Sequence, residues 1–274
     1  MRSTRVFLGD DCTRKQREII DLVLKFRFIN RIQIQTFLHH KDARRVNAWL
    51  KDLVAKQYLG RIYSRKLLEN TKPAIYYLSY AGINYLKQRN NLSVNEVKKL
   101  YEDKHASQTF VTHCVTIASY CIQFGALSTA EWVYTTTTKT ELWNQESFQT
   151  LRPDVYMEKR KQTKIKRSNS KVIRYFIDLF DPHVPRYALR YRMKQYIEFN
   201  DSYEWKEFAP NAKFPYILLV LPNEQKLRHV RKYVQEQLNE SYDVETMQFM
   251  LTTFADVLAH GINGHIWETV KAEE

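Results

Sequence analysis

Apolar residues recur every three or four positions along residues 14–54, which is the spacing of helices with one buried face. Thr13 is a predicted N-cap, and the amphipathic first helix behind it has an apolar set formed by Ile19, Ile20, Val23, Leu24 and Phe26 to Phe28. A short second helix is predicted over residues 31–38. The segment that begins at Lys41 predicts a third helix, whose inward residues are Ala43, Val46, Leu50, Leu53 and Val54.

The pattern then changes to two short β-type runs, LGRIYS at 59–64 and AIYYLS at 74–79. A loop with lysine and arginine residues joins them and closes at Pro73, and another helix follows Gly82. Three helices followed by a hairpin are typical of a winged helix, whose third helix enters the DNA major groove. We therefore expect a tail over residues 1–12 and a winged helix-turn-helix domain over residues 13–88.

Residues 89–104 are polar and predict a connector between two domains, for which a helix is one possible conformation. From His105 the chain alternates helical and strand-like segments, which predicts an α/β domain over residues 105–274. Strands are expected over 131–138, 151–158 and 171–180, then a helix after Pro185. The continuous apolar run FPYILLVLP at 214–222 indicates a strand that is buried on both sheet faces, and a helix and a final strand follow it.

The net charge of +13 is divided unevenly along the chain. Residues 1–90 hold 19 Lys and Arg against 7 Asp and Glu, a net charge of +12, and residues 91–274 have a net charge of +1. A nucleic-acid footprint segregates charge in this way, because lysine and arginine release counterions from phosphates. A surface for anionic lipid or for an acidic protein is the alternative interpretation.

Four polar residues lie on the third helix away from most of its apolar stripe and are candidates for contacts with bases or phosphates: Arg44, Arg45, Asn47 and Lys51. The competing interpretation is a solvated helix face. The predicted hairpin adds four further cations, which suit phosphate contacts better than base readout: Arg61, Arg65, Lys66 and Lys72.

Composition argues against several other classes of protein. No apolar run approaches the roughly 20 residues that a membrane span requires, and the N-terminus lacks the pattern of a signal peptide. The three cysteines form no CxxC pair, which favours reduced thiols in the cytoplasm over a disulfide scaffold.

The second domain has one candidate for catalytic chemistry. Helix, three strands, helix and strand, with Pro153-Asp154 at the start of the middle strand, is the order used by metal-dependent nucleases of the PD-(D/E)XK fold. In such nucleases two carboxylates hold Mg²⁺ and a lysine two residues after the second acid positions water. Asp154 and Asp178 are the candidate acids, but the lysine position holds Phe180, and Lys194 is the candidate substitute. We therefore favour a nuclease-like scaffold without catalysis and expect no cofactor, with bound Mg²⁺ as the alternative.

The chain resembles the replication-relaxation family of bacterial plasmids and integrative conjugative elements. The resemblance lies in Thr13 to Gln16, the segment Ala43-Arg44-Arg45, Leu50 and Leu53, and the close of the hairpin at Leu78, Ser79 and Gly82. In the second half it continues with His113, Trp132, the triplet 152–154, the IDLFD strand, Lys194 to Tyr196, and the run at 214–220, so it covers about nine-tenths of the chain. The acidic strand departs from the usual Glu-x-Asp.

The resemblance implies a protein that binds double-stranded DNA and serves replication or mobilisation of a mobile element. We expect a sequence-specific, cytoplasmic DNA-binding protein that recognises an origin, docks a relaxase or a replication initiator, or forms a homodimer. A Mg²⁺-dependent endonuclease that uses Asp154, Asp178 and Lys194 is one alternative, and a winged-helix transcriptional regulator is another.

Overall fold

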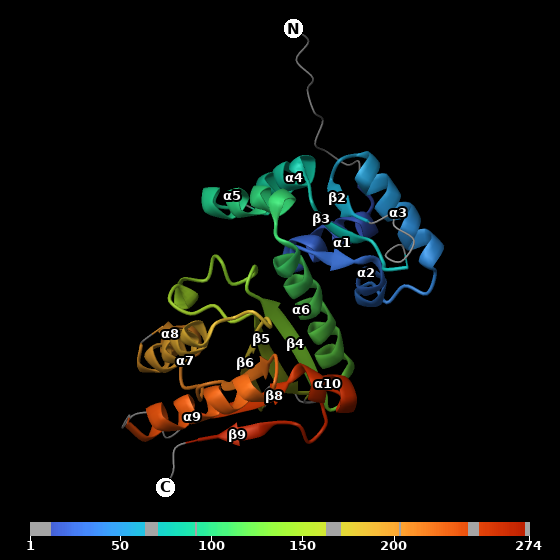
Figure 1. The fold of residues 1–274 in the computed structure, drawn as a ribbon. Coiled ribbons are helices and arrows are strands. Elements are labelled where there is room, and N and C mark those ends of the chain that lie inside the picture. The colour runs from blue at the N-terminus through green and yellow to red at the C-terminus, as the bar shows by residue number, and fades with distance from the viewer. Residues whose placement is uncertain are drawn as a thin grey trace. The chain divides into compact units, whose positions relative to one another are not determined.

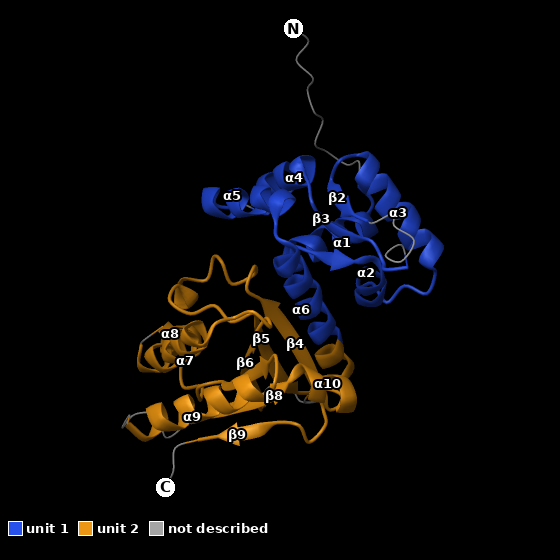
Figure 2. Cartoon of the chain, viewed as in Figure 1, with its two compact units in different colours: residues 1–122 blue, residues 123–274 orange. Residues whose placement is uncertain are grey.

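The computed structural model describes residues 12–63, 71–90, 92–162, 171–202, 204–240 and 247–271 (Figure 1). The chain divides into two compact units, residues 1–122 and residues 123–274 (Figure 2). The division lies inside helix α6 (Gln108–Ala126), beyond the expected domain start at His105.

Unit 1 begins with the three predicted helices, α1 (Arg14–Phe26), α2 (Arg31–Phe37) and α3 (Ala43–Ala55). The Thr13 hydroxyl accepts a hydrogen bond from the Gln16 backbone, and the Gln16 side chain accepts one from the Thr13 backbone. This capping box satisfies two backbone donors and fixes the start of α1. The predicted continuation of α1 to Phe28 is wrong, because Arg27 takes a positive φ of 62° and ends the helix.

A small antiparallel sheet completes the first part of unit 1. Its strands are β1 (Ile29–Asn30), β2 (Leu59–Ile62) and β3 (Ile75–Leu78), in the order β1-β3-β2. β2 and β3 form the predicted hairpin, with Leu59 opposite Leu78 and Ile62 opposite Ile75. β1 is a strand that the sequence pattern did not reveal, since it has only two residues.

The polar segment predicted as a connector includes an ordered helix. After α4 (Tyr80–Asn90), α5 (Val94–Glu102) starts with a capping box between Ser93 and Glu96. A short 3₁₀ turn, η1 (Asp103–His105), follows, and the buried carboxylate of Asp103 forms an ion pair with Arg27. This segment therefore packs against the rest of unit 1.

The first turns of α6 also pack within unit 1. The buried side-chain amide of Gln33 donates hydrogen bonds to the Val115 carbonyl at 2.7 Å and to the Ser119 hydroxyl at 2.8 Å. Phe28 forms a small buried cluster with Val111 and Cys114. These contacts explain why unit 1 extends past His105.

Unit 2 is built on a six-stranded mixed sheet in the order β4-β5-β6-β7-β8-β9. The strands are β4 (Trp132–Thr138), β5 (Val155–Lys161), β6 (Val172–Leu179), β7 (Tyr216–Leu221), β8 (Phe249–Thr253) and β9 (Glu268–Val270). β6, β7 and β8 are parallel to one another, and the other pairs are antiparallel. β7 lies between two parallel neighbours and is buried along most of its length, which confirms the interpretation of its apolar run.

Three helices cover one face of this sheet: α7 (Arg186–Asp201), α8 (Glu204–Phe208) and α9 (Glu224–Glu240) (Figure 1). Phe176 and Phe249 of the sheet meet Tyr196 and Phe199 of α7 in the main core. A turn, η2 (Glu146–Phe148), adds Phe148 to it, and the short helix α10 (Phe254–His260) follows β8. The protein thus has a mixed α and β fold, as expected.

The sequence raised two questions about compartment, a membrane span and the state of the cysteines. No helix in the described residues is long and apolar enough to cross a membrane. The three cysteines, Cys12, Cys114 and Cys121, are buried, and no disulfide joins them in the part of the chain that the structure describes.

Candidate nucleic-acid interface and acidic pair

Helix α3 presents the candidate DNA-contacting residues on one exposed face. Asp42 caps the helix, because its Oδ1 accepts hydrogen bonds from the backbone N–H groups of Arg44 at 2.8 Å and Arg45 at 3.4 Å. Val46, Leu50 and Leu53 are buried, and the opposite side of the helix is exposed. Arg44, Asn47 and Lys51 follow one another at three- and four-residue spacing, so their side chains share one face, and Arg45 lies beside it.

The cations on α3 differ from those on α1 in their partners. On α1, Arg14 and Lys15 both form ion pairs with Glu18. Within the described residues, Arg44, Arg45 and Lys51 form no ion pair. The acidic residue of α3, Asp52, does not neutralise them, because it accepts a hydrogen bond from Gln16 at 2.6 Å and pairs with Lys56 at 2.9 Å. These paired contacts also lower the pKa of Asp52.

The hairpin places two further candidates at the surface. Arg61 and Lys72 are both exposed, and the guanidinium of Arg61 lies 5.4 Å from the centre of the Tyr63 ring. Arg61 is opposite Tyr76 in the register of β2 and β3. Burial raises the pKa of Tyr76, although Arg61 and Arg31 oppose that rise. The other two hairpin candidates, Arg65 and Lys66, lie outside the described residues.

The close of the hairpin explains part of the sequence motif around Gly82. The Ser79 backbone N–H donates to the Tyr58 carbonyl at 3.1 Å, and the Ser79 hydroxyl donates to the Gln57 carbonyl. A Cβ on Gly82 would lie 2.2 Å from the same Tyr58 oxygen, so only glycine fits at that position. The turn after α3 is therefore tied directly to the start of α4.

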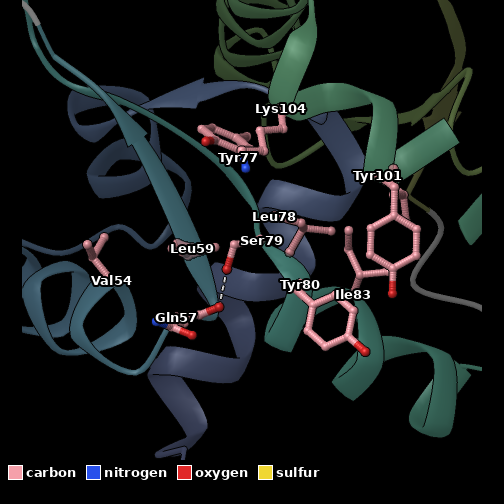
Figure 3. Close-up of a pocket in the computed structure, with 11 residues that line it drawn as sticks. Val54, Gln57, Leu59, Tyr77, Leu78, Ser79, Tyr80, Ile83, Tyr101 and Lys104 are labelled. Atoms are coloured by element: carbon pink, nitrogen blue, oxygen red, sulfur yellow. Dashed lines mark hydrogen bonds between the residues drawn. The ribbon is translucent and has the colours of Figure 1, made fainter. Parts of the chain in front are cut away.

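A hollow of about 390 Å³ opens beside this closure (Figure 3). Its wall includes Gln57, Ser79, Tyr80 and Tyr101, and the rings of the two tyrosines stack with centres 5.8 Å apart. The lining is mostly apolar, and its residues with polar groups include Tyr77 and Lys104.

In unit 2 the two candidate acids lie side by side at the ends of adjacent strands. The Asp154 backbone N–H donates to Asp178 Oδ1 at 2.9 Å, and the Leu179 backbone N–H donates to Asp154 Oδ2 at 3.1 Å. Both carboxylates are buried. The two acids that the sequence pattern paired therefore lie in direct contact.

The cation beside these acids is Arg192, and the sequence interpretation missed it. Arg192 Nε donates to Asp178 Oδ2 at 2.5 Å, and its Nη2 donates to Asp178 Oδ1 at 3.2 Å and to the Arg152 carbonyl at 2.7 Å. Lys194, the candidate proposed from the sequence, is exposed and pairs with Glu198 at 3.4 Å. Positions two residues apart on a helix point in nearly opposite directions, so only Arg192 faces the acids.

Tyr196 completes the environment of Asp178. Its hydroxyl donates to Asp178 Oδ2 at 2.9 Å, so the Asp178 carboxylate accepts four hydrogen bonds from Asp154, Arg192 and Tyr196. Burial and then the Asp178 carboxylate raise the pKa of Tyr196 well above its ordinary value. Burial alone would lower the pKa of Arg192, but the charge and hydrogen bonds of Asp178, together with Tyr196 and Asp154, outweigh burial and raise that pKa.

The acidic pair forms an ion-pair and hydrogen-bond network with Arg192 and Tyr196. Phe180, at the position where a nuclease has its lysine, is buried in the main core. Among the described residues, no group of three or more His, Cys, Asp or Glu side chains is arranged to hold a metal ion. The acidic pair can hold the ends of β5 and β6 against α7 through hydrogen bonds.

Comparison with known proteins places the chain by family. No curated protein and no solved structure gave a match. A family model described as replication-relaxation matches residues 21–211, which span α3, the hairpin, the acidic pair and Arg192. The match begins after Thr13 and Gln16 and ends before the apolar run at 214–220, so it is shorter than the resemblance expected from the sequence. Since the model covers well over half of its length, the chain belongs to the replication-relaxation family.

Proposed function

We propose that this protein binds double-stranded DNA in a sequence-specific manner and acts in replication or mobilisation of a bacterial mobile element. The observation that carries the proposal is the exposed face of α3, where Arg44, Arg45 and Lys51 have no ion-pair partner within the described residues. Unpaired cations on an exposed helix suit phosphates and the acceptor edges of guanine.

The order of elements supports a winged helix in unit 1. α1, β1, α2 and α3 precede the β2–β3 hairpin, and the sheet order β1-β3-β2 places the hairpin next to the first strand. In winged helices the third helix enters the major groove and the hairpin contacts the backbone. We assign base and phosphate contacts to Arg44, Arg45, Asn47 and Lys51, and backbone contacts to Arg61, Arg65, Lys66 and Lys72.

Family membership supports the biological setting. Replication or mobilisation of a mobile element requires a protein that recognises an origin, and the α3 face supplies a candidate for that recognition. Unit 2 would then dock a relaxase or a replication initiator, or join two copies of the chain. A winged-helix transcriptional regulator remains the competing assignment, and the position of the bound sites would distinguish it.

We infer that unit 2 is a nuclease-like scaffold in which the acids have a structural role. The order α6, β4, β5, β6, α7 and β7 supports a PD-(D/E)XK-like core. Magnesium would need carboxylate oxygens as ligands, and both oxygens of Asp178 already accept hydrogen bonds from Arg192. The competing assignment is a Mg²⁺-dependent endonuclease, which the adjacency of Asp154 and Asp178 favours.

The DNA assignment can be tested with a double variant, Arg44→Ala with Arg45→Ala. Binding to DNA that carries the element's own origin should weaken, and the slope of log K against log salt should fall by about one unit for each phosphate contact that is lost. A suitable control is Arg14→Ala with Lys15→Ala, which removes the same charge from cations that already pair with Glu18. If the α3 variant and the native protein bind the DNA with equal affinity and equal salt slope, α3 is not the helix that contacts the DNA.

A genome-wide or plasmid-wide footprint tests the biological setting. Sites clustered at an origin or beside a relaxase gene would support replication or mobilisation. A lone site at a promoter would support the transcriptional regulator instead.

The scaffold assignment is tested by incubating the full chain with supercoiled plasmid and Mg²⁺ or Mn²⁺. We expect no nicking above the level seen with the Asp154→Ala variant. Nicking that disappears in that variant would show that unit 2 is an endonuclease.

A further inference from the structure

A second basic surface lies on unit 2, on helices α7 and α9, away from the acidic pair. It is formed by Arg186, Tyr187, Arg190 and Tyr191 of α7 with His229 of α9, and we call it the α7–α9 surface. Tyr187 is 76% exposed and Tyr191 is 63% exposed, whereas Leu189 and Met193 on the same helix are buried in the core. The basic and aromatic side chains therefore occupy the solvent side of α7.

The arginines of this surface have no acidic partner among the residues that the structure describes. Within the described residues neither Arg186 nor Arg190 forms an ion pair, although unit 2 as a whole contains almost as many acids as bases. The first turn of α7 contains no acidic residue. Cations at the positive end of a helix are electrostatically unfavourable, so Arg186 at the first position of α7 destabilises the free protein slightly. A bound anion would remove that cost.

Contacts with α9 hold Arg190 in place. Its Nε donates to His229 Nε2 at 3.2 Å, and its guanidinium lies 5.7 Å from the centre of the Tyr233 ring. This hydrogen bond requires an unprotonated Nε2 on His229. Burial, followed by the charges of Arg190 and Arg186, lowers the pKa of His229, and only Glu236 opposes them. The histidine thus orients the arginine without adding a charge of its own.

Among the described residues, the Nη atoms of Arg190 have no hydrogen-bond partner. An arginine fork held at its Nε matches the paired oxygens of a phosphate, and tyrosine hydroxyls also bind phosphate oxygens. Arg186 precedes Arg190 by one helical turn, and Tyr187 precedes Tyr191 by the same interval. A row of arginines and tyrosines spaced along a helix suits a ligand with repeated negative charges.

We propose that the α7–α9 surface binds the phosphodiester backbone of a nucleic acid. This contact is separate from the proposed DNA reading by α3, since it uses different residues on the other unit. It would let one chain hold a second segment of nucleic acid while α3 holds its site.

The test uses the full chain, two charge-matched double variants and random-sequence oligonucleotides, both duplex and single-stranded. Arg186→Gln with Arg190→Gln removes two charges from the proposed surface. Arg231→Gln with Lys232→Gln removes two charges from exposed cations of α9 that already pair with Glu268 and Glu236. We expect the first variant to lose about tenfold in affinity and about two units of salt slope, and the control to lose less than about twofold. If the loss of affinity is larger for duplex than for single-stranded oligonucleotides, the surface binds the backbone of double-stranded nucleic acid, and the reverse result assigns it to single strands.

A second measurement follows His229 by NMR in the native full chain. Addition of the oligonucleotide should raise the pKa of His229, because bound phosphates offset the charges of Arg186 and Arg190. Equal losses of affinity in the two variants, or an unchanged His229 pKa on saturation, would overturn the proposal. Loss of binding to polyglutamate but not to oligonucleotides would also overturn it and assign the surface to an acidic protein.

The variant Arg44→Ala with Arg45→Ala is measured on the same oligonucleotides. A loss in the α7–α9 variant alone would leave this inference standing while the α3 assignment fails. A loss in the α3 variant alone would support the α3 assignment and overturn the proposal for the α7–α9 surface.

Discussion

Arg192 contacts both carboxylate oxygens of Asp178, through Nε at 2.5 Å and Nη2 at 3.2 Å. Both side chains are largely buried, with exposed fractions of 17% for Arg192 and 4% for Asp178. The same Nη2 donates to the Arg152 carbonyl just before Pro153, so one side chain joins α7 to the ends of β5 and β6. The pair therefore connects three elements of unit 2.

The first prediction is that Arg192→Ala strongly destabilises the protein. Removing one partner leaves the Asp178 charge buried and unpaired, which costs about 3–5 kcal/mol. The control Lys194→Ala removes a cation two residues away whose exposed pair with Glu198 contributes less than about 0.5 kcal/mol. Urea denaturation followed by circular dichroism measures both values. Similar free energies of unfolding for the two variants would contradict a structural role for Arg192.

Of the residues around this ion pair, the sequence pattern predicted the acids but not their cation. The strand order and the Pro153-Asp154 dipeptide located Asp154 and Asp178, because both acids lie at strand ends that the apolar pattern marks. The partner cation was expected at Lys194, by analogy with a displaced lysine. Only the rotation of α7 about its axis decides between residues 192 and 194, and that rotation is fixed by the burial of Leu189, Met193 and Tyr196.

The exposed face of α3 was predictable because buried apolar residues fix the rotation of that helix as well. Val46, Leu50 and Leu53 fix which side of the helix is buried, so the opposite side follows from the helical period. The role of residues 89–104 was not predictable in the same way. α5 buries two apolar residues, Val97 and Leu100, and the turn that follows it adds the long-range ion pair of Asp103 with Arg27.

The second prediction concerns the hairpin close. Gly82→Ala would place a methyl group 2.2 Å from the Tyr58 carbonyl oxygen, so the backbone must shift, at a cost of about 1–3 kcal/mol. Gly125→Ala in α6 is the matched control, since nothing lies within 4 Å of its added Cβ. Alanine favours a helix, so that change should stabilise the protein by about 0.5–1 kcal/mol. Thermal denaturation should shift in opposite directions, and a shift in the same direction would contradict the close approach.

The third prediction concerns the dependence of stability on pH. Burial outweighs the ion pair with Arg27 and raises the pKa of Asp103 to about 6 from an ordinary value of 3.8. The folded protein therefore binds this proton more tightly than the unfolded chain does. The stabilisation is fully present below about pH 4 and is lost as the pH rises through about 6, a change of about 3 kcal/mol.

Asp103→Asn should remove this part of the pH dependence. The variant and the native protein are compared by urea denaturation at several pH values between 4 and 7, where the difference between their free energies of unfolding isolates this carboxyl group. A difference that stays constant over this interval would show that Asp103 does not titrate there.

The fourth prediction separates two roles of Asp42, its capping oxygen at the start of α3 and its negative charge. Asp42 caps the helix, yet its carboxylate lies beside Arg44 and Arg45, where it would repel DNA phosphates. Asp42→Asn keeps a capping oxygen and removes the charge, so we expect affinity for DNA to rise by a factor on the order of three with little change in stability. Asp42→Ala removes both and should cost about 1 kcal/mol of stability. Fluorescence anisotropy and urea denaturation measure the two effects. Weaker binding by Asp42→Asn would mean that the start of α3 does not face the phosphates.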